Sequence, residues 1–94
     1  MMTMRVRWLS ASRRDVVRLH AFLKDVSPRT ATRIPEMLNA AAKALPEFPQ
    51  KGLRLEDFLP RDVRALIIGD YELRYELAGG EIIILRIWHT REDR

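Results

Sequence analysis

Residues 63–89, VRALIIGDYELRYELAGGEIIILRIWH, contain three apolar runs that are separated by two short turn signals. The runs are rich in isoleucine and also contain tyrosine, and both residue types favour strands. The intervening segments, Gly69-Asp70 and Ala78-Gly79-Gly80, are typical of tight hairpin turns. We therefore predict a meander of three antiparallel strands.

The second and third of these strands differ in how they are covered. Apolar residues alternate with Glu72, Arg74 and Glu76 in the second strand, so one sheet face is expected to be buried and the other open and polar. The third strand, EIIILRIWH, is apolar on both faces for most of its length, which favours a central position in the sheet. Arg86 and Trp88 share one face of this strand, opposite Leu85 and Ile87. If Leu85 and Ile87 are buried, Arg86 emerges on the open face, although a shift of one residue in register would reverse this.

A strand and two helices are expected before the meander. Residues 4–9, MRVRWL, alternate in polarity and predict a first strand. Ser12 and Asp15 have the spacing of a capping box, which predicts the start of a helix. An apolar stripe predicts that this helix runs to about residue 26, and the stripe consists of Val16, Leu19, Leu23 and Val26. A second helix is predicted from Pro28 to Pro46, with Ser27 accepting a bond from a free amide. Pro35 interrupts its pattern, and we expect a kink there in preference to a separate turn over 28–33.

Residues 46–62 contain three prolines and no sustained period, which predicts an ordered loop. We expect apolar side chains to pin this loop, namely Phe48, Leu53, Leu55 and Phe58. The predicted fold is α+β with the order β-α-α-β-β-β. Two N-terminal helices pack on one face of a mostly antiparallel four-stranded sheet, and residues 1–94 form one domain.

Composition narrows the classes of function. The 94 residues include no cysteine and two histidines, so neither a metal site nor a cofactor is expected. No stretch is apolar and long enough for a signal peptide or a membrane span, and a cytoplasmic location is the expectation. Residues 1–34 carry eight basic residues against Asp15 and Asp25, a net charge of +6, whereas residues 35–94 carry a net charge of −2. The basic N-terminal part favours an acidic partner.

Five segments, in this order and spacing, resemble the RelE/ParE superfamily of toxins from bacterial type II toxin–antitoxin systems, with the ParE branch the closer likeness. The segments are WLSASRRDV, SPRTA, FPQKGLRL, VRALIIGDYELRYEL and IIILRIWHTRED. The resemblance implies a growth-inhibiting toxin and a cognate antitoxin whose flexible C-terminal segment wraps it. An acidic amphipathic segment of that kind is suited to the basic N-terminal part. The residues predicted to contact it are Arg5, Arg7, Arg13, Arg14, Leu19 and Leu23.

The superfamily contains two toxic activities, and the fold does not choose between them. The RelE branch cuts messenger RNA in the ribosome, which requires a proton acceptor, a proton donor and cations around the phosphate. The ParE branch poisons DNA gyrase. The tyrosine near the C-terminus that is common in RelE-like enzymes is missing here. His89 is the one side chain of the meander whose residue type ordinarily has a pKa near neutral pH, and its simplest role is a hydrogen bond to a backbone carbonyl.

We therefore favour a toxin that inhibits gyrase by binding. The alternatives are a messenger ribonuclease, for which Arg64, Arg86 and His89 are the catalytic candidates, and a non-toxic family member. The residues predicted to contact the target are Arg64, Arg74, Arg86, Trp88, His89 and Arg91.

Overall fold

The computed structural model describes residues 3–92, and it orders them as a strand, two helices and a meander. Within that range the elements in chain order are β1 (Arg5–Trp8), α1 (Ser10–Lys24), α2 (Pro28–Ala44), the 3-10 helix η1 (Leu45–Glu47), β2 (Leu53–Arg54), the 3-10 helix η2 (Glu56–Phe58), β3 (Asp62–Ile68), β4 (Tyr71–Ala78) and β5 (Glu81–His89). The predicted α+β class and the predicted order of the main elements are confirmed.

Residues 3–92 form a mixed sheet of five strands, one more than predicted, in the order β1-β5-β4-β3-β2. The additional strand is β2, which lies inside the predicted loop and pairs with β3 through Leu53 and Arg54. The three strands of the meander are antiparallel, and β1 runs parallel to β5. The turn between β4 and β5 places Gly79 and Gly80 at φ values of 58° and 77°, which glycine adopts without strain.

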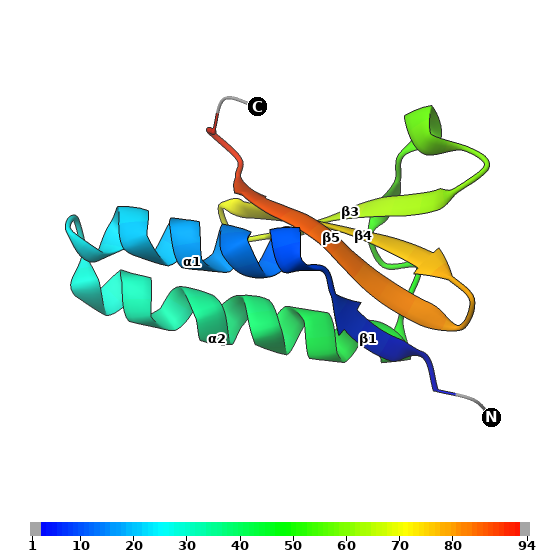
Figure 1. The fold of residues 1–94 in the computed structure, drawn as a ribbon, viewed down its shortest axis with the longest axis horizontal. Helices are drawn as coiled ribbons and strands as arrows, with labels where there is room; N and C mark the ends of the chain where they lie inside the picture. The colour runs from blue at the N-terminus through cyan, green and yellow to red at the C-terminus, as the bar shows by residue number, and fades with distance from the viewer. Residues whose placement is uncertain (1–2, 93–94) are drawn as a thin grey trace.

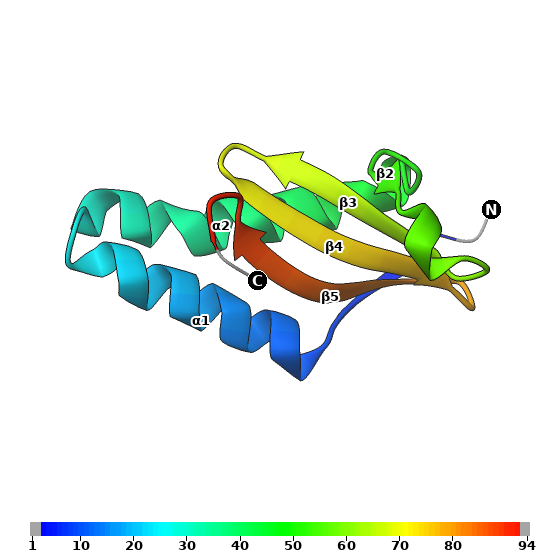
Figure 2. The ribbon, with the colours of Figure 1, turned by 90° about the horizontal axis from the view of Figure 1, so that it is seen from above.

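The two helices cover different parts of the sheet. Figures 1 and 2 show α2 passing beneath the sheet, while α1 lies beside α2 and along the β5 side. The apolar stripe of α2 and the inward faces of β4 and β5 form most of the core, whose fully buried members include Ile34, Leu38, Ala42, Leu45, Leu73, Tyr75, Ile82, Ile84 and Ile87. Because β5 lies between β1 and β4 over residues 81–84, its predicted central position is confirmed there.

The helix starts differ from the prediction. α1 begins at Ser10 with Leu9 as its cap, and the Ser12 hydroxyl donates to the Leu9 carbonyl oxygen at 2.6 Å, so the predicted capping box is wrong. Its end is also earlier than predicted, and Val26 is 74% exposed. Pro28 opens α2 as predicted, but the Ser27 hydroxyl donates to another side chain and caps no amide. No helix formed by residues 3–92 is long and apolar enough to cross a bilayer.

α2 continues through Pro35 without interruption, so no separate turn precedes it. The loop after α2 is ordered, but not by all the predicted side chains, because Phe48 is 68% exposed and Leu53 is 74% exposed. The Tyr75 hydroxyl holds it instead, donating to the Pro49 carbonyl oxygen at 2.7 Å and accepting the Gly52 N–H at 2.8 Å. Tyr75 of β4, a residue distant in the sequence, therefore fixes the position of the loop.

Candidate functional site

Two arginines and a tryptophan meet on the sheet face that points away from the core. Arg74 of β4 pairs directly with Arg86 of β5, and Glu72 pairs with Trp88; directly paired residues of an antiparallel sheet share a face. The guanidinium carbons of Arg74 and Arg86 lie 4.7 and 5.1 Å from the centre of the Trp88 ring, within cation–π range. We call Arg74, Arg86 and Trp88 the arginine–tryptophan cluster.

A β-bulge decides that Arg86 belongs to this face. The pairing register shifts after Arg74, so β5 contains one residue, Leu85, without a direct partner on β4. Strict alternation from the buried Ile84 would have turned Arg86 inward. The extra residue shifts the alternation, so Ile87 is buried while the Arg86 side chain is 45% exposed. The expectation that Arg86 emerges on the open face is confirmed, and the bulge is its cause.

A carboxylate from α1 holds Arg86 in place. Asp15 Oδ2 accepts a hydrogen bond from Arg86 Nε at 2.7 Å, and Asp15 Oδ1 accepts one from Arg86 Nη2 at 3.1 Å. The same carboxylate accepts the Ile87 backbone N–H at 2.8 Å and Arg18 Nη2 at 3.2 Å. Burial opposes ionisation of Asp15, but the bonds from Arg86, Ile87 and Arg18 outweigh it and lower the pKa of Asp15 below its usual 3.8. The bond to Asp15 in turn raises the pKa of Arg86.

Arg74 is the more enclosed of the two arginines, with 24% of its side chain exposed. Its Nη2 donates to Glu72 at 2.9 Å, and its guanidinium carbon lies 5.6 Å from the centre of the Phe58 ring as well as over Trp88. Its Nε is buried and has no hydrogen-bond partner within residues 3–92. Carboxylates also lie on this face, because Glu72 and Glu76 both alternate with core-facing residues along β4. Glu76 forms an ion pair with Arg61 at 2.8 Å.

His89 lies on the opposite face of the sheet from the cluster. It pairs with the buried Tyr71 across β4 and β5, and the two rings meet edge to face with centroids 5.3 Å apart. The imidazole Nδ1 accepts the Arg91 backbone N–H at 3.1 Å, so the expected bond to a backbone carbonyl is replaced by one to an amide. Arg91 is exposed just beyond β5. Neither residue is therefore brought into the arginine–tryptophan cluster.

Arg64 also lies apart from the cluster. It pairs with Tyr75 in the β3–β4 register and so shares the core-facing side. Its Nη1 donates to the carbonyl oxygens of Gln50 and Gly52, both at 3.1 Å, and its Nε donates to Asp62 at 2.9 Å. With 12% of its side chain exposed, Arg64 secures the loop before β2 and has little surface left for a partner.

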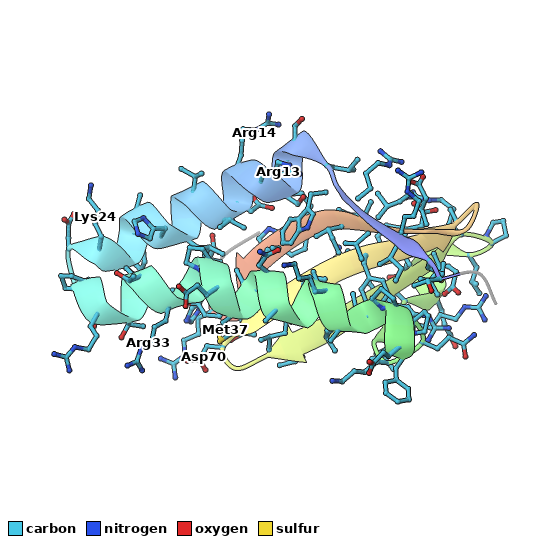
Figure 3. The ribbon with its side chains drawn as sticks, turned by 90° about the horizontal axis from the view of Figure 1, so that it is seen from below. Arg13, Arg14, Lys24, Arg33, Met37 and Asp70 are labelled. Atoms are coloured by element: carbon cyan, nitrogen blue, oxygen red, sulfur yellow. The ribbon has the colours of Figure 1, made fainter. Side chains whose placement is uncertain are left out.

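The residues predicted to contact an antitoxin fall into three settings. Arg5 and Arg7 are exposed on β1, and Arg7 forms an ion pair with Glu81 at 3.2 Å. Arg13 and Arg14 are exposed on the first turns of α1, and Figure 3 shows Arg14 projecting away from the helix pair. The two leucines lie deeper, since Leu19 is 3% exposed and belongs to the core while Leu23 is half-buried at its edge.

Two members of the site were not anticipated, Asp15 and Phe58. The capping-box spacing concealed Asp15, although it lies four residues before Leu19 on the buried stripe of α1, where an unpaired charge is costly. That position was the available signal for a buried ion pair. The sequence predicts that Phe58 pins the loop, but its ring lies beneath the guanidinium groups of Arg74 and Arg61, at 5.6 and 5.9 Å. No local pattern connects Phe58 with strands that follow it.

The fold and the cluster define a class of small α+β protein that offers fixed cations on an open sheet face. Residues 6–94 match the family described as ParE toxin of type II toxin-antitoxin system, parDE. The curated relatives include Toxin RelE1 and Toxin RelE2 of Caulobacter vibrioides. RelE1 is 35% identical over 85 residues, covering 88% of this chain and 89% of RelE1. RelE2 is 31% identical over 85 residues, covering 90% of this chain and 93% of RelE2.

Solved structures share the fold of this chain. A chain from the chromosomal ParDE system of P. aeruginosa superposes with a TM-score of 0.77 at 21% identity, covering 93% of this chain and 96% of that one. A chain from the toxin–antitoxin complex RelBE2 of Mycobacterium tuberculosis gives a TM-score of 0.66 at 26% identity, with coverage of 95% and 93%. The chain therefore belongs to the ParE toxin family of type II toxin–antitoxin systems, within the RelE/ParE superfamily.

Proposed function

We propose that this chain is a growth-inhibiting toxin, neutralised by a cognate antitoxin, that inhibits DNA gyrase by binding it through the arginine–tryptophan cluster. The observation that carries the proposal is the composition of the open face. Fixed guanidinium groups lie beside an aromatic ring, whereas His89 is on the other side of the sheet. The action would take place in the bacterial cytoplasm, where gyrase works.

Cleavage of RNA through its own 2′-hydroxyl needs a group that removes a proton and one that protonates the leaving oxygen. Tyr71 and Tyr75 are buried on the core side, and the Tyr75 hydroxyl is occupied by the loop. Burial raises the pKa of both tyrosines, which makes them weaker acids at neutral pH. The histidine and the tyrosines of the meander are thus turned away from the cations that would hold a phosphate.

The open face has features of a protein-binding surface. Arginine and tryptophan are enriched among the residues that dominate binding energy in protein interfaces. Glu72 and Glu76 lie beside the arginines, so the face carries both signs of charge. Such a mixture repels a continuous run of phosphates but suits a protein partner with complementary charges.

The proposed antitoxin contact lies on the helix pair. A groove of about 420 Å³ between α1 and α2 is lined by Trp8, Arg13, Val16, Val17, Pro35 and Asn39. Arg13 lines the groove itself, and Figure 3 shows Arg14 projecting from α1 into solvent. An acidic amphipathic antitoxin segment would bury apolar side chains in the groove and meet the basic side chains around it.

The experiment is a gyrase supercoiling assay with purified toxin, paired with mapping of cuts in messenger RNA on translating ribosomes. We expect inhibition of supercoiling with trapped, cleaved DNA and an intact message. Arg86→Ala should weaken inhibition at least tenfold, because it removes an exposed, pre-oriented guanidinium. Arg33→Ala, which removes an exposed arginine from α2, is the matched control and should act like the unmodified toxin.

Two results would contradict the proposal. The ribonuclease alternative is favoured by the RelE names of the curated relatives, and cuts at defined codon positions with unaffected supercoiling would establish it. Induced expression that leaves growth unchanged would instead indicate a non-toxic family member.

A further inference from the structure

Asp15 is charged and yet almost completely buried, with 4% of its side chain exposed. A buried carboxylate is retained at low energetic cost only when hydrogen bonds replace its lost hydration. Asp15 receives four such bonds, two from Arg86, one from the Ile87 N–H and one from Arg18. What these bonds accomplish differs from one donor to the next.

The bond to Ile87 completes the sheet edge. β1 pairs with β5 only as far as Ile84, where the Leu9 N–H donates to the Ile84 carbonyl oxygen at 3.1 Å. Beyond that point α1 takes the place of the missing strand, because Asp15 accepts the Ile87 N–H and Arg18 Nη2 donates to the Ile87 carbonyl oxygen at 3.0 Å. A neutral amide in place of Asp15 could accept the same N–H, so this role does not require a charge.

The bonds to Arg86 have another effect. Arg86 is 45% exposed and water could solvate its guanidinium, so the arginine needs no buried partner for its own sake. Ordering a long side chain opposes folding, because rotamer entropy is lost. The two bonds to Asp15 and the contact with Trp88, at 5.1 Å, nevertheless fix its direction. Arg86 Nη1 donates to none of residues 3–92 in this arrangement and remains available to a partner.

We infer that Asp15 is a positioning residue for target recognition: from α1, behind the edge of β5, it orients Arg86 so that the Nη1 side of the guanidinium is presented on the open face. The inference rests on the proposed function of the arginine–tryptophan cluster. It connects the helix that carries the basic N-terminal surface with the face that meets the target, through a contact between residues 71 positions apart. Pre-orientation favours binding because the partner does not have to order the side chain.

The test is a double-mutant cycle with Asp15→Asn, Arg86→Ala and the combined variant. The readout is the toxin concentration that gives half-maximal growth inhibition, which does not depend on knowing the target. Asp15→Asn keeps the shape and an acceptor for the Ile87 N–H but loses the charge. We expect a loss of about tenfold in potency in the otherwise unmodified chain and less than about twofold when Arg86 is already alanine. Thermal midpoint and antitoxin affinity are measured on every variant.

Glu81→Gln is the matched control, because it removes the carboxylate of another arginine pair on β5, the Arg7–Glu81 pair at 3.2 Å, away from the cluster. It should leave potency unchanged. Equal losses from Asp15→Asn in both backgrounds would assign Asp15 a general structural role and overturn the inference while leaving the proposed function intact. No effect of Arg86→Ala by itself would overturn both.

A second measurement covers the case in which Asp15→Asn does not fold. In the unmodified toxin, the NMR order parameter of the Arg86 Nε–H bond should resemble that of the backbone, whereas that of the exposed Arg33 should be low. An Arg86 side chain as mobile as Arg33 would overturn the inference without any variant.

Discussion

The Tyr75 hydroxyl holds the loop between α2 and β2 through two hydrogen bonds. The substitution Tyr75→Phe removes this hydroxyl with almost no change in side-chain volume, and we predict a loss of stability. The side chain is fully buried, and its oxygen bonds the Pro49 carbonyl at 2.7 Å and the Gly52 N–H at 2.8 Å. Gly52 is itself buried, so its N–H would lose its partner away from water. An unsatisfied buried donor costs about 1–3 kcal/mol, and loss of the hydrogen bond to the carbonyl of the half-buried Pro49 adds about 0.5 kcal/mol.

The expected loss for Tyr75→Phe is therefore about 1.5–3.5 kcal/mol, a large share of the roughly 5–15 kcal/mol that holds a typical domain folded. For a domain of this size, at about 4–8 °C per kcal/mol, the loss corresponds to a fall of about 6–28 °C in thermal midpoint. Urea unfolding followed by tryptophan fluorescence measures it, because Trp8 and Trp88 both lie in the sheet. The slope against urea should stay unchanged, since the same surface is exposed on unfolding.

Tyr71→Phe provides the matched control on the same strand and the same face. Tyr71 is 6% exposed, and its hydroxyl forms no hydrogen bond with the part of the chain that the structure describes, so its removal should change stability by less than about 0.5 kcal/mol. Equal effects of the two substitutions would refute the reasoning, because the loss would then not arise from the bonds to the loop.

Three further substitutions have defined outcomes. Leu38→Ala should destabilise the fold by about 2–5 kcal/mol in chemical denaturation, because Leu38 is fully buried beneath the sheet. Pro35→Ala should raise the thermal midpoint by stabilising α2 by about 1–2 kcal/mol, since it restores an N–H that can bond the Ala31 carbonyl; a lower midpoint would contradict this. The folded-state pKa of Asp15 is lowered, so its ionisation stabilises the fold fully above the ordinary value near 3.8, and this contribution is lost as pH falls below it. Asp15→Asn should therefore cost less stability at about pH 3 than at about pH 7, and an equal cost at both would show that the charge is not involved.

The order of the main elements could be predicted from the sequence, because it depends on local periodicity. The alternation in β4 has a period of two and the stripe in α2 has a period of about 3.6, and each is complete within a few residues. Proline and glycine indicated where helices and strands end, because their effect on the backbone is also local. β2 escaped prediction because its two residues are both exposed and show no period.

The candidate site was only partly predictable. Arg74, Arg86 and Trp88 were named from their places on the strands, and the structure brings them together. His89 and Arg64 were named with them, but each lies on the core-facing side. Like the residues of the cluster, His89 and Arg64 are polar residues within apolar strands. Only the pairing register shows which residues lie on the open face and which on the core-facing side.

The sequence by itself determined that a helix pair and a two-faced sheet would form, and that arginines would lie on the sheet. Only the tertiary structure decided which of them face outward together. One unpaired residue, Leu85, shifts the alternation of β5, and Asp15 reaches Arg86 across 71 positions of sequence. Both features depend on the packing of segments that are distant in the chain. The free energy that favours one strand register, or one buried ion pair, comes from contacts among many residues. A short stretch of sequence therefore does not predict either feature.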